Sequence, residues 1–373
     1  MAALIPQDSQ PEVTEPSPHN PFAEITTTLY QQIIQVLKEH LDTVDERYYD
    51  LIACYVLMTR RYQHFESLGY LHFNGPPGSG KTRALELVAE LTEETPILAS
   101  AITPAALFHL VHDKQPSFVA FDEFDRTPRD YVNEFTQLLN AGYRKGLKAF
   151  RSVYSEQGKK WETQAFDVYC PKGIATVSQL TDTLASRCLR IPMSRTTKPE
   201  IRFRLDHEKI SQVRQQLGEY KFLCFDKKPF PHESWGNMRI AELFEPLYQC
   251  APTTEIEQVL NELANEMSQI VKAQEAESPQ GFVIQLVHDQ IGEATSLDGA
   301  GEINVKVRDL RNQAVAKLAD MKNEQAYWTE RRITGILKTV GFTPRHTRTS
   351  RQWTIPNDKL SKLYDRYPPV TEA

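Results

Sequence analysis

Gly75-Pro76-Pro77-Gly78-Ser79-Gly80-Lys81-Thr82 is the stretch that decides the fold class of this 373-residue chain. It satisfies every position of the pattern G-x-x-x-x-G-K-[ST]. The apolar run 70–74 before it predicts a strand, and apolar residues at helical spacing over 82–91 predict a helix. Glycines in such a turn let backbone N–H groups point at phosphate oxygens, and the helix N-terminus adds partial positive charge. The sequence therefore predicts a phosphate-binding loop in a parallel α/β core.

Two residues of this loop are expected to act on a bound nucleotide. Lys81 would reach the β- and γ-phosphates, and Thr82 would ligate Mg²⁺. ATP and Mg²⁺ are therefore the predicted cofactors. The residues expected to contact the nucleotide are Gly75, Pro76, Pro77, Gly78, Ser79, Gly80, Lys81, Thr82 and Arg83.

The second half of the predicted site is Phe118-Val119-Ala120-Phe121-Asp122-Glu123, an apolar run that ends in two acids. A buried strand of this kind would place Asp122 beside the loop, where it would hold Mg²⁺. Glu123 would polarise the attacking water, because water is a poor nucleophile until a base orients it. A strand with a solvated acidic end is the alternative. Asp125 and Asp130 are interpreted as surface acids.

A further short apolar run, 171–178, ends in small hydroxyl residues. Thr176 and Ser178 are both candidates for a hydrogen bond to the γ-phosphate or to the attacking water, since strand alternation places them on one face. The sequence leaves the choice between them open, and a plain strand end is the alternative.

The segment Leu184-Ala185-Ser186-Arg187-Cys188 precedes the last predicted core strand. Here the chain resembles the AAA+ ATPases, in which an arginine in a similar Ser-Arg-Cys sequence reaches into the ATP site of the neighbouring subunit. The resemblance implies that Arg187 stabilises charge on the transferring phosphoryl group, a role that suits a planar guanidinium. It also implies a homo-oligomer, since a single chain would lack this group. Arg190 and Arg195 are second candidates, and a surface ion pair is the alternative for Arg187.

Farther along the chain, Trp235-Gly236-Asn237-Met238-Arg239-Ile240 leads into an amphipathic run, 240–248. This segment resembles the second sensor of AAA+ lids, which implies that Arg239 contacts the γ-phosphate in its own chain's site. The order of all these motifs resembles AAA+ ATPases of phages, plasmids and integrated mobile elements, often encoded near primase functions. Some of those are similar to minichromosome-maintenance helicases and end in a winged helix. The resemblance covers roughly residues 45–365 and implies a ring of subunits, expected to be a hexamer.

Two segments are expected to contact nucleic acid. Residues 147–169 predict a β-hairpin with Lys159 and Lys160 near its turn. In the minichromosome-maintenance resemblance, a lysine on such a hairpin grips the DNA backbone inside the ring. Residues 328–353 carry six Lys or Arg against one Glu, and helix, glycine and basic hairpin in that order predict a winged helix. Its candidate phosphate contacts are Arg331, Arg332, Arg345, Arg348 and Arg351. A solvated turn and a protein-binding winged helix are the alternatives.

Composition limits the class of protein. The net charge is −6, which excludes a generic polyanion binder, so any DNA contact must come from local basic patches. The five cysteines form no C-x-x-C pair, which argues against a metal centre or a disulfide framework. No apolar run reaches the roughly 18 residues of a membrane span, and the N-terminus lacks the order of a signal peptide. We therefore expect no membrane association and a cytoplasmic location.

The expected organisation has five segments. They are a disordered acidic, proline-rich tail at 1–24, a helical lead-in at 25–66, a three-layer AAA+ α/β ATPase core at 67–195, a helical lid at 196–275 and a winged-helix domain at 280–373, entered through a flexible stretch at 276–281. The expected function is that of an ATP-hydrolysing DNA helicase or translocase in replication of a mobile element or phage, with primase or other replication proteins as partners. An ATPase that loads or remodels another replication protein, and a nucleotide-dependent DNA-binding regulator, remain open.

Overall fold

The computed structural model describes residues 21–93, 95–99, 102–155, 158–202, 204–222, 227–230, 237–291, 301–318, 322–346 and 351–368. Contacts between residues divide the chain into unit 1, Met1–Leu263, and unit 2, Ala264–Ala373. Most of the expected tail at 1–24 lies outside the described residues, but helix α1 already begins at Pro21. Residues 21–24 are therefore the first turn of a helix, and the expectation of a tail is wrong for them.

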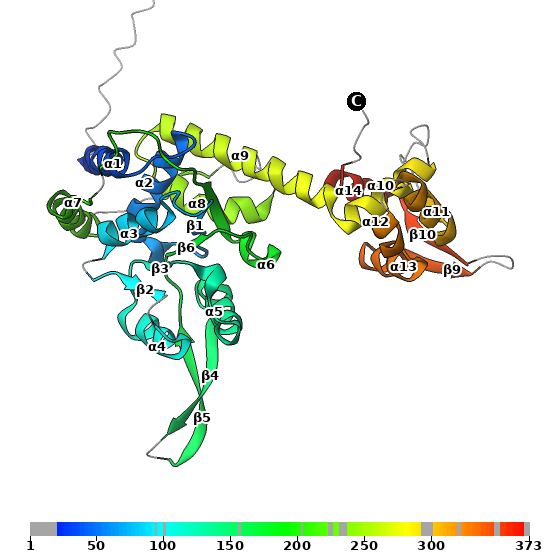
Figure 1. Cartoon of the computed structure of the whole chain (residues 1–373), viewed down its shortest axis with the longest axis horizontal. Helices are drawn as coiled ribbons and strands as arrows, with labels where there is room; N and C mark the ends of the chain where they lie inside the picture. The colour runs from blue at the N-terminus through cyan, green and yellow to red at the C-terminus, as the bar shows by residue number, and fades with distance from the viewer. Residues whose placement is uncertain are drawn as a thin grey trace, which may run out of the picture. The chain divides into compact units, whose positions relative to one another are not determined.

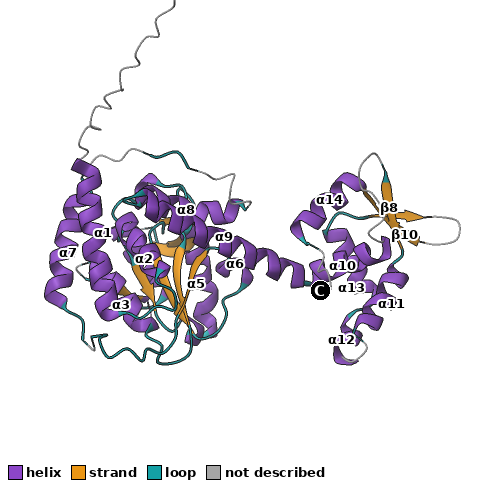
Figure 2. Ribbon diagram, turned by 90° about the horizontal axis from the view of Figure 1, so that it is seen from above, coloured by secondary structure: helices purple, strands orange, loops and turns teal. Residues whose placement is uncertain are grey.

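A parallel five-stranded sheet forms the centre of unit 1, which confirms the predicted α/β class. Its strands are β1 (Tyr70–Asn74), β2 (Ile97–Leu98), β3 (Val119–Phe121), β6 (Lys172–Thr176) and β7 (Cys188–Pro192). They lie side by side in the order β2-β3-β6-β1-β7. Figure 2 shows this sheet flanked by helices. Because both faces are covered, the strands are nearly continuous apolar runs, and Leu71, Phe73 and Ile174 are fully buried.

The order of the strands fixes where a ligand can approach the sheet. After β1, the chain runs through helix α3 (Lys81–Thr92) to β2, which forms one edge of the sheet. After β6, the neighbour of β1, the chain continues to β7, which forms the opposite edge. Here two adjacent parallel strands have connections that run toward opposite edges of the sheet. In open α/β sheets, ligands bind in the crevice that forms at the carboxyl ends of such strands. The loop at 75–80 lies at this point.

The remaining helices of unit 1 surround the sheet (Figure 1). They are α1 (Pro21–His40), α2 (Arg47–Thr59), α4 (Pro104–Lys114), α5 (Arg129–Gly142), α6 (Asp182–Ala185), α7 (His207–Tyr220) and α8 (Met238–Cys250), and short 3₁₀ turns lie at Tyr62–His64 (η1) and Phe124–Arg126 (η3). Helix α9 (Thr254–Glu277) begins in unit 1 and continues past Leu263 into unit 2. The side chain of Thr103 caps helix α4, and Pro104 occupies its first turn. Helix α3 packs against β1, β3 and β6, and therefore holds the loop before it against the sheet.

The predicted hairpin is present as β4 (Lys148–Ser155) and β5 (Lys160–Asp167), an antiparallel pair separate from the main sheet. Figure 1 shows that it projects from the end of α5. Near its base, the buried ring of Phe166 packs against Phe108 with 6.0 Å between ring centroids. Arg151 forms an ion pair with Glu134 of α5 at 2.6 Å. These contacts anchor the hairpin, because a lone two-stranded ribbon is only marginally stable in water.

Unit 2 combines helices with a three-stranded antiparallel sheet in the order β8-β10-β9. Its elements in chain order are α10 (Pro279–Ile291), β8 (Glu302–Val305), α11 (Val307–Lys317), α12 (Lys322–Tyr327), α13 (Glu330–Thr339), β9 (Thr343–His346), β10 (Arg351–Pro356) and α14 (Asn357–Arg366). Trp353, Ile333 and Leu337 are central to its core.

Helix α13 follows its prediction, and two other expectations for this region need correction. Thr329 caps α13, and the chain leaves it through Gly341, whose φ of +100° suits glycine. The basic hairpin expected at 347–355 is instead formed by β9 and β10, and residues 347–350 lie outside the described residues. The flexible stretch expected at 276–281 is almost entirely helical, because α9 ends at Glu277 and α10 begins at Pro279. Among the described residues, every helix is too short or too polar to span a bilayer.

Candidate nucleotide-binding site

The loop between β1 and α3 has a backbone that glycine permits. Gly78 and Gly80 have φ angles of +75° and +86°, in the left-handed region that other residues rarely adopt. Gly75 has no room for a side chain, since a Cβ there would lie 2.2 Å from the carbonyl oxygen of Met193. The three glycines therefore let the chain turn sharply from β1 into the first turn of α3, whose N–H groups have no partner within the helix.

Donors of the loop converge on one small region. The ammonium group of Lys81 donates hydrogen bonds to the carbonyl oxygens of Gly75 and Pro76, at 2.9 Å each. Ser79 is 4% exposed, and among the described residues its Oγ finds no hydrogen-bond partner. An ammonium group, an unpaired hydroxyl and the start of a helix form a donor set that fits a polyphosphate. Arg83 lies off to one side, where its guanidinium donates to the carbonyl oxygen of Arg202 at 3.4 Å.

Asp122 lies beside the loop, as the sequence predicts. It follows β3 directly, and its two carboxylate oxygens accept from the hydroxyl of Thr82 at 2.9 and 3.2 Å. One hydroxyl and one carboxylate are oxygen ligands of the kind that Mg²⁺ takes, usually together with water and phosphate oxygens. The described residues hold no group of three or more His, Cys, Asp or Glu that could bind a metal by themselves. Mg²⁺ would fit here only together with the nucleotide.

Glu123 has an unusual backbone. Its φ is +47°, a left-handed conformation that few non-glycine residues adopt and that recurs at functional sites. Its carboxylate forms an ion pair with Arg126 at 2.7 Å, and both side chains are exposed. The turn after β3 therefore directs Glu123 away from the buried strand while Asp122 stays against Thr82.

The end of β6 separates the two sensor candidates. Thr176 is 1% exposed, and its Oγ1 donates to the carbonyl oxygen of Ser178 at 2.7 Å and lies 2.8 Å from Nε2 of His72. Its hydroxyl is thus engaged inside the protein. The hydroxyl of Ser178 is exposed and donates to Asp125 at 3.2 Å. Of the two sensor candidates, Ser178 is the one with an exposed hydroxyl.

Asp125 is exposed, as predicted for a surface acid, and it also joins the turn after β3 to the end of β6. Its carboxylate accepts from the backbone N–H groups of Val177 and Ser178 at 3.2 and 3.1 Å. Partial burial acts to raise the pKa of Asp125, but these hydrogen bonds outweigh it and lower the pKa. No spacing rule in the sequence distinguishes this acid from its neighbours.

Two arginines, one on β7 and one after it, lie next to the loop of their own chain. Arg195 Nε donates to the carbonyl oxygen of Pro77 at 3.2 Å and lies 3.6 Å from where a Cβ on Gly78 would be. Arg190, on β7, donates to Oδ1 of Asn74 at 3.0 Å. The sequence treats both as second candidates for a role across a subunit boundary. The structure places them beside the phosphate-binding loop instead.

Arg187 and Arg239 lie together at the opposite, amino-terminal edge of the sheet. Their guanidinium carbons are 5.6 and 4.9 Å from the ring centroid of Tyr143. The carbonyl oxygen of Tyr143 accepts from the N–H of Leu68, just before β1. Arg239 also forms an ion pair with Glu242 at 2.6 Å. With about 3.3 Å per strand residue, the length of β1 separates this cluster from the loop by roughly 15 Å.

The position of Arg239 contradicts its predicted role. A contact with the γ-phosphate in its own chain would require Arg239 at the carboxyl edge, where the loop lies. Helix α8 instead packs against the start of β1, since Leu243 touches the Cα side of Gly69 and the hydroxyl of Ser67 donates to the carbonyl oxygen of Glu242. Trp235 and Gly236, which belong to the same predicted segment, lie outside the described residues.

The candidate nucleic-acid contacts are placed in part. Lys159 and Lys160 are exposed at the hairpin turn, and Lys160 approaches Glu162 at 3.4 Å. In unit 2, Arg331 is exposed, whereas the guanidinium of Arg332 stacks 3.3 Å from the ring centroid of Tyr327. Of the other candidate arginines in unit 2, Arg345 pairs with Glu302 at 3.3 Å. Arg348 and the side chain of Arg351 lie outside the described residues.

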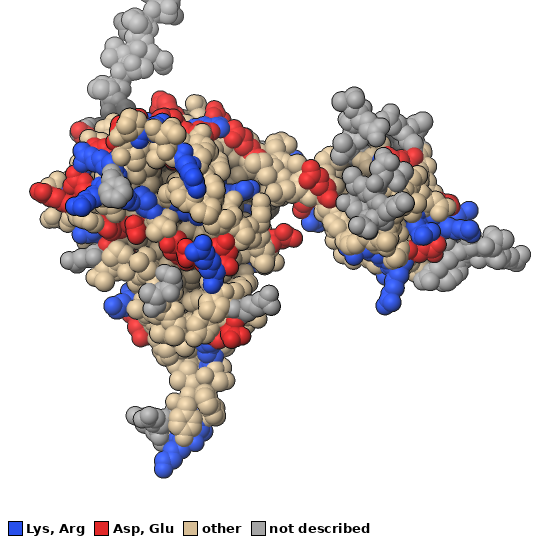
Figure 3. Space-filling view, viewed as in Figure 1, with Lys and Arg blue, Asp and Glu red and all other residues tan. Residues whose placement is uncertain are grey.

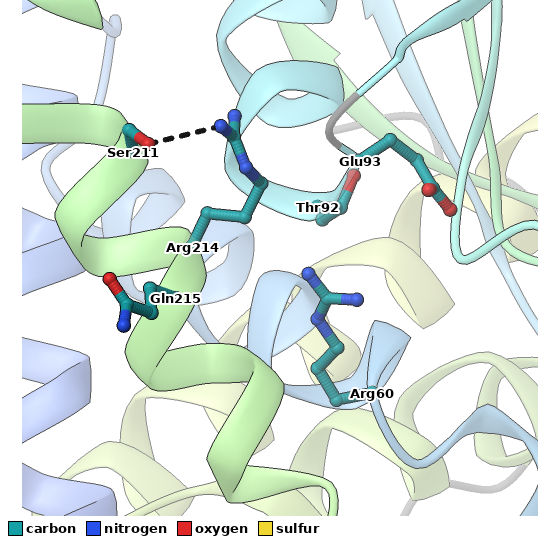
Figure 4. A pocket seen from close by; sticks show the side chains of 6 residues that line it. All are labelled: Arg60, Thr92, Glu93, Ser211, Arg214 and Gln215. Atoms are coloured by element: carbon teal, nitrogen blue, oxygen red, sulfur yellow. Dashed lines mark hydrogen bonds between the residues drawn. The ribbon is translucent and has the colours of Figure 1, made fainter. Parts of the chain in front are cut away.

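A separate cavity of about 400 Å³ lies at the far end of α3 (Figure 4). It is lined by Arg60, Thr92, Glu93, Ser211, Arg214 and Gln215. Thr92 is the last residue of α3 and the loop precedes the first, so at 1.5 Å per residue the cavity is roughly 18 Å from the loop. It is not part of the candidate nucleotide site.

No protein-family profile matches the chain, and no curated protein matches it. Among solved structures, it is similar to the apo structure of the NrS-1 C-terminal region, with 15% identity, a TM-score of 0.37 and coverage of 92% of this chain and 79% of that chain. The A form of that region gives 14% identity, the same coverage and a TM-score of 0.38. The structure of Drosophila ORC bound to DNA gives 13% identity, 96% coverage of each chain and a TM-score of 0.22. These TM-scores are too low to support a conclusion about this chain's fold or activity.

Proposed function

We propose that this chain is a Mg²⁺-dependent ATPase of the AAA+ type that moves along DNA during replication of a mobile element or phage. The observation that carries the proposal is the meeting of Lys81, Thr82 and Asp122 at the carboxyl ends of β1 and β3, the two parallel strands on either side of β6. The loop supplies donors for phosphates, and the hydroxyl–carboxylate pair supplies oxygens for the ion. Bound Mg²⁺ would neutralise charge on the β- and γ-phosphates.

The protein's own residues then have distinct tasks. Lys81 would exchange its two carbonyl partners for phosphate oxygens, and Arg195 would add a second positive charge from the strand end after β7. Glu123 is the candidate base for the attacking water, and its release from Arg126 would free the carboxylate for that proton. Ser178 is the exposed hydroxyl that could orient the water or the γ-phosphate.

The site is incomplete within one chain, which favours assembly into a ring. Arg187 and Arg239 are on the wrong edge to reach their own loop, and among the described residues Arg187 Nε has no hydrogen-bond partner although it is buried. We propose that the two arginines act on the site of a neighbouring copy, where a guanidinium would stabilise the charge on the transferring phosphoryl group. A hexamer is the ring size that the resemblance suggests.

Unit 2 supports a DNA-binding role of the winged-helix kind. Helix α13, the antiparallel strands β9 and β10 and the basic residue Arg331 supply the parts that such a domain uses. Arg332 and Arg345 already have partners in Tyr327 and Glu302, so they contribute less free charge than their sequence suggests. A replication setting, with primase as a partner, rests on the resemblance of the motifs alone.

Calorimetric titration with ATP and Mg²⁺ tests the site. The wild-type chain should bind the nucleotide, and Lys81→Ala should weaken binding by at least 10-fold, because an interaction between charged groups is lost. Lys114→Ala, an exposed lysine on α4, is the matched control and should bind as the wild type does. Absence of nucleotide binding by the folded wild-type chain would end the proposal.

Strand displacement separates the motor from its rivals. Unwinding of a forked duplex by the purified chain with ATP supports the helicase. ATP hydrolysis without displacement favours a loader or remodeler of another replication protein. Binding to one duplex sequence with negligible turnover favours a regulator.

A further inference from the structure

The hairpin has two very different faces. Register pairs Tyr154 directly with Trp161 and Phe150 with Ala165, which places the three aromatic side chains on the same face of the ribbon. Phe150, Tyr154 and Trp161 are 69%, 49% and 70% exposed. The other face carries Phe166 and packs against α4 through Phe108. We call the exposed set, Phe150, Tyr154 and Trp161, the aromatic ribbon.

The exposure of these rings needs a reason. Large aromatic side chains gain much by leaving water, and clustered exposed ones mark sites of interaction. The rings of Tyr154 and Trp161 meet edge to face at 5.6 Å, so they support each other but leave flat surface in solvent. The residues between them and Phe150 on this face, Ser152 and Thr163, are small and exposed. Among the described residues of the hairpin, these small neighbours leave the three rings largely exposed.

Positive charge lies at the end of the same ribbon. Lys159 lies in the turn that joins the two strands, and Lys160 begins β5 next to Trp161, on the opposite face of the ribbon. Figure 3 shows basic atoms at the tip of this projection and mostly uncharged atoms along the part that is visible there. Flat aromatic rings with cations next to them match the chemistry of a nucleic-acid strand, which offers base faces and phosphates together.

We propose that the aromatic ribbon binds single-stranded nucleic acid by stacking of bases on its rings, while Lys159 and Lys160 contact the phosphates. Four strand residues separate Phe150 from Tyr154, about 13 Å, so the two ends of the ribbon would engage different bases. A duplex keeps its base faces inside the stack and offers no such contact. The inference rests on the proposed function as a DNA motor and names how the strand is held.

The experiment measures binding of an oligo(dT) strand by fluorescence anisotropy over a series of salt concentrations. Trp161→Ala and Phe150→Ala should each weaken binding roughly 5- to 100-fold, the range for loss of one base–aromatic stack, and leave the salt dependence unchanged. Trp161→Phe keeps a flat ring and should restore most of the affinity. Phe222→Ala removes an aromatic that is 85% exposed outside the hairpin, and should bind as the wild type does.

Lysine variants and a modified strand complete the design. Lys160→Ala should reduce the slope of log affinity against log salt by about 0.7, the value for one phosphate contact with a single strand. On a strand of abasic sugar-phosphates, wild type and Trp161→Ala should bind alike, because no base remains to stack. Circular dichroism and ATP binding check that each variant is folded.

The outcomes distinguish this inference from the proposed function. If the wild type binds ATP and oligo(dT) but Trp161→Ala and Phe150→Ala bind oligo(dT) equally well, stacking is wrong and the motor proposal stands. If Trp161→Ala instead breaks up an assembly seen by sedimentation, the ribbon is a contact between copies and the inference is overturned. If the wild type binds ATP but no strand, both the inference and the DNA motor fail.

Discussion

At the carboxyl edge of the parallel sheet, Lys81, Thr82 and Asp122 lie within hydrogen-bonding distance of the loop or of one another. At the amino edge, Arg187 and Arg239 share the ring of Tyr143. The first edge has donors and acidic oxygens, yet among the described residues it lacks the arginine pair. The second edge has the arginines and no phosphate-binding loop.

If the proposed function holds, this difference teaches that one chain carries both halves of the catalytic site but keeps them apart. Helix α8 is fixed at the amino edge by its contacts with Ser67 and Gly69, so a small side-chain movement cannot bring Arg239 to its own loop. Stacking on Tyr143 and pairing with Glu242 also hold that guanidinium in place. A second copy that sets its amino edge against this carboxyl edge would unite the halves, and the following predictions test that view.

The largest effect is expected from Arg187→Ala. Turnover should fall about 10³- to 10⁵-fold, the range for loss of an arginine that stabilises the transferring phosphoryl group, while ATP affinity changes little. Steady-state ATPase assays and calorimetry measure the two quantities. Arg214→Ala, which removes an arginine from the cavity of Figure 4, is the control and should keep full turnover.

Mixing sharpens this test of the two edges. Arg187→Ala and Lys81→Ala subunits are each expected to be inactive, but a mixed assembly contains interfaces with an intact loop and an intact Arg187. Some turnover should therefore return. Mixtures that demonstrably co-assemble and stay inactive would contradict an arginine acting between copies.

The second effect concerns Glu123 alone. Glu123→Gln should lower turnover by about 10²- to 10⁴-fold and leave ATP affinity intact, since it removes a base and keeps the shape of the side chain. Asp130→Asn, a change of an exposed acid at the start of α5, should have no effect on either quantity. Unchanged hydrolysis by Glu123→Gln would remove this residue from the carboxyl edge's chemistry.

How far the sequence predicts these edges depends on how local the signal is. The loop and Asp122 are predicted because a strand, a glycine turn and a helix follow one another within a few residues, and a second apolar strand ends in acids. The β4–β5 hairpin and a helix closed by Gly341 are also local patterns, and both are present.

The features that sequence reasoning missed depend on packing between distant segments. The prediction for Arg239 is wrong because contacts with Ser67 and Gly69, far away in the chain, set how α8 packs on the start of β1. Arg195 and Asp125 join the carboxyl edge through bonds to Pro77 and Ser178, and no periodicity announces such bonds. The choice between Thr176 and Ser178 required knowing which one is buried.

A smaller effect is expected from Arg195→Ala. Removal of a cation next to Pro77 should weaken ATP binding about 10-fold, because an exposed charge contributes less than one fixed in a closed site. ADP, with one phosphate fewer, should lose less than ATP if the guanidinium acts near the end of the polyphosphate. Equal affinities in Arg195→Ala and wild type would show that the carboxyl edge does not use this residue.

The smallest expected effect is a pH dependence of stability that comes from His72 on β1. Burial, with the nearby charge of Arg190, lowers the pKa of His72 to about 4, and Asp125 opposes this only weakly. The unfolded chain takes up the proton near pH 6.5, so stability from the neutral ring is full above that pH and is lost as the pH falls from 6.5 towards 4. Between pH 7 and 5.5 this amounts to about 1 kcal/mol in the free energy of unfolding, at 1.36 kcal/mol per pKa unit.

Urea unfolding at the two pH values should show that loss in the wild type. The loss should be smaller by this amount in His72→Gln, which keeps a polar side chain near Thr176. An identical decline in both proteins would mean that His72 on β1 does not stay neutral in the folded state.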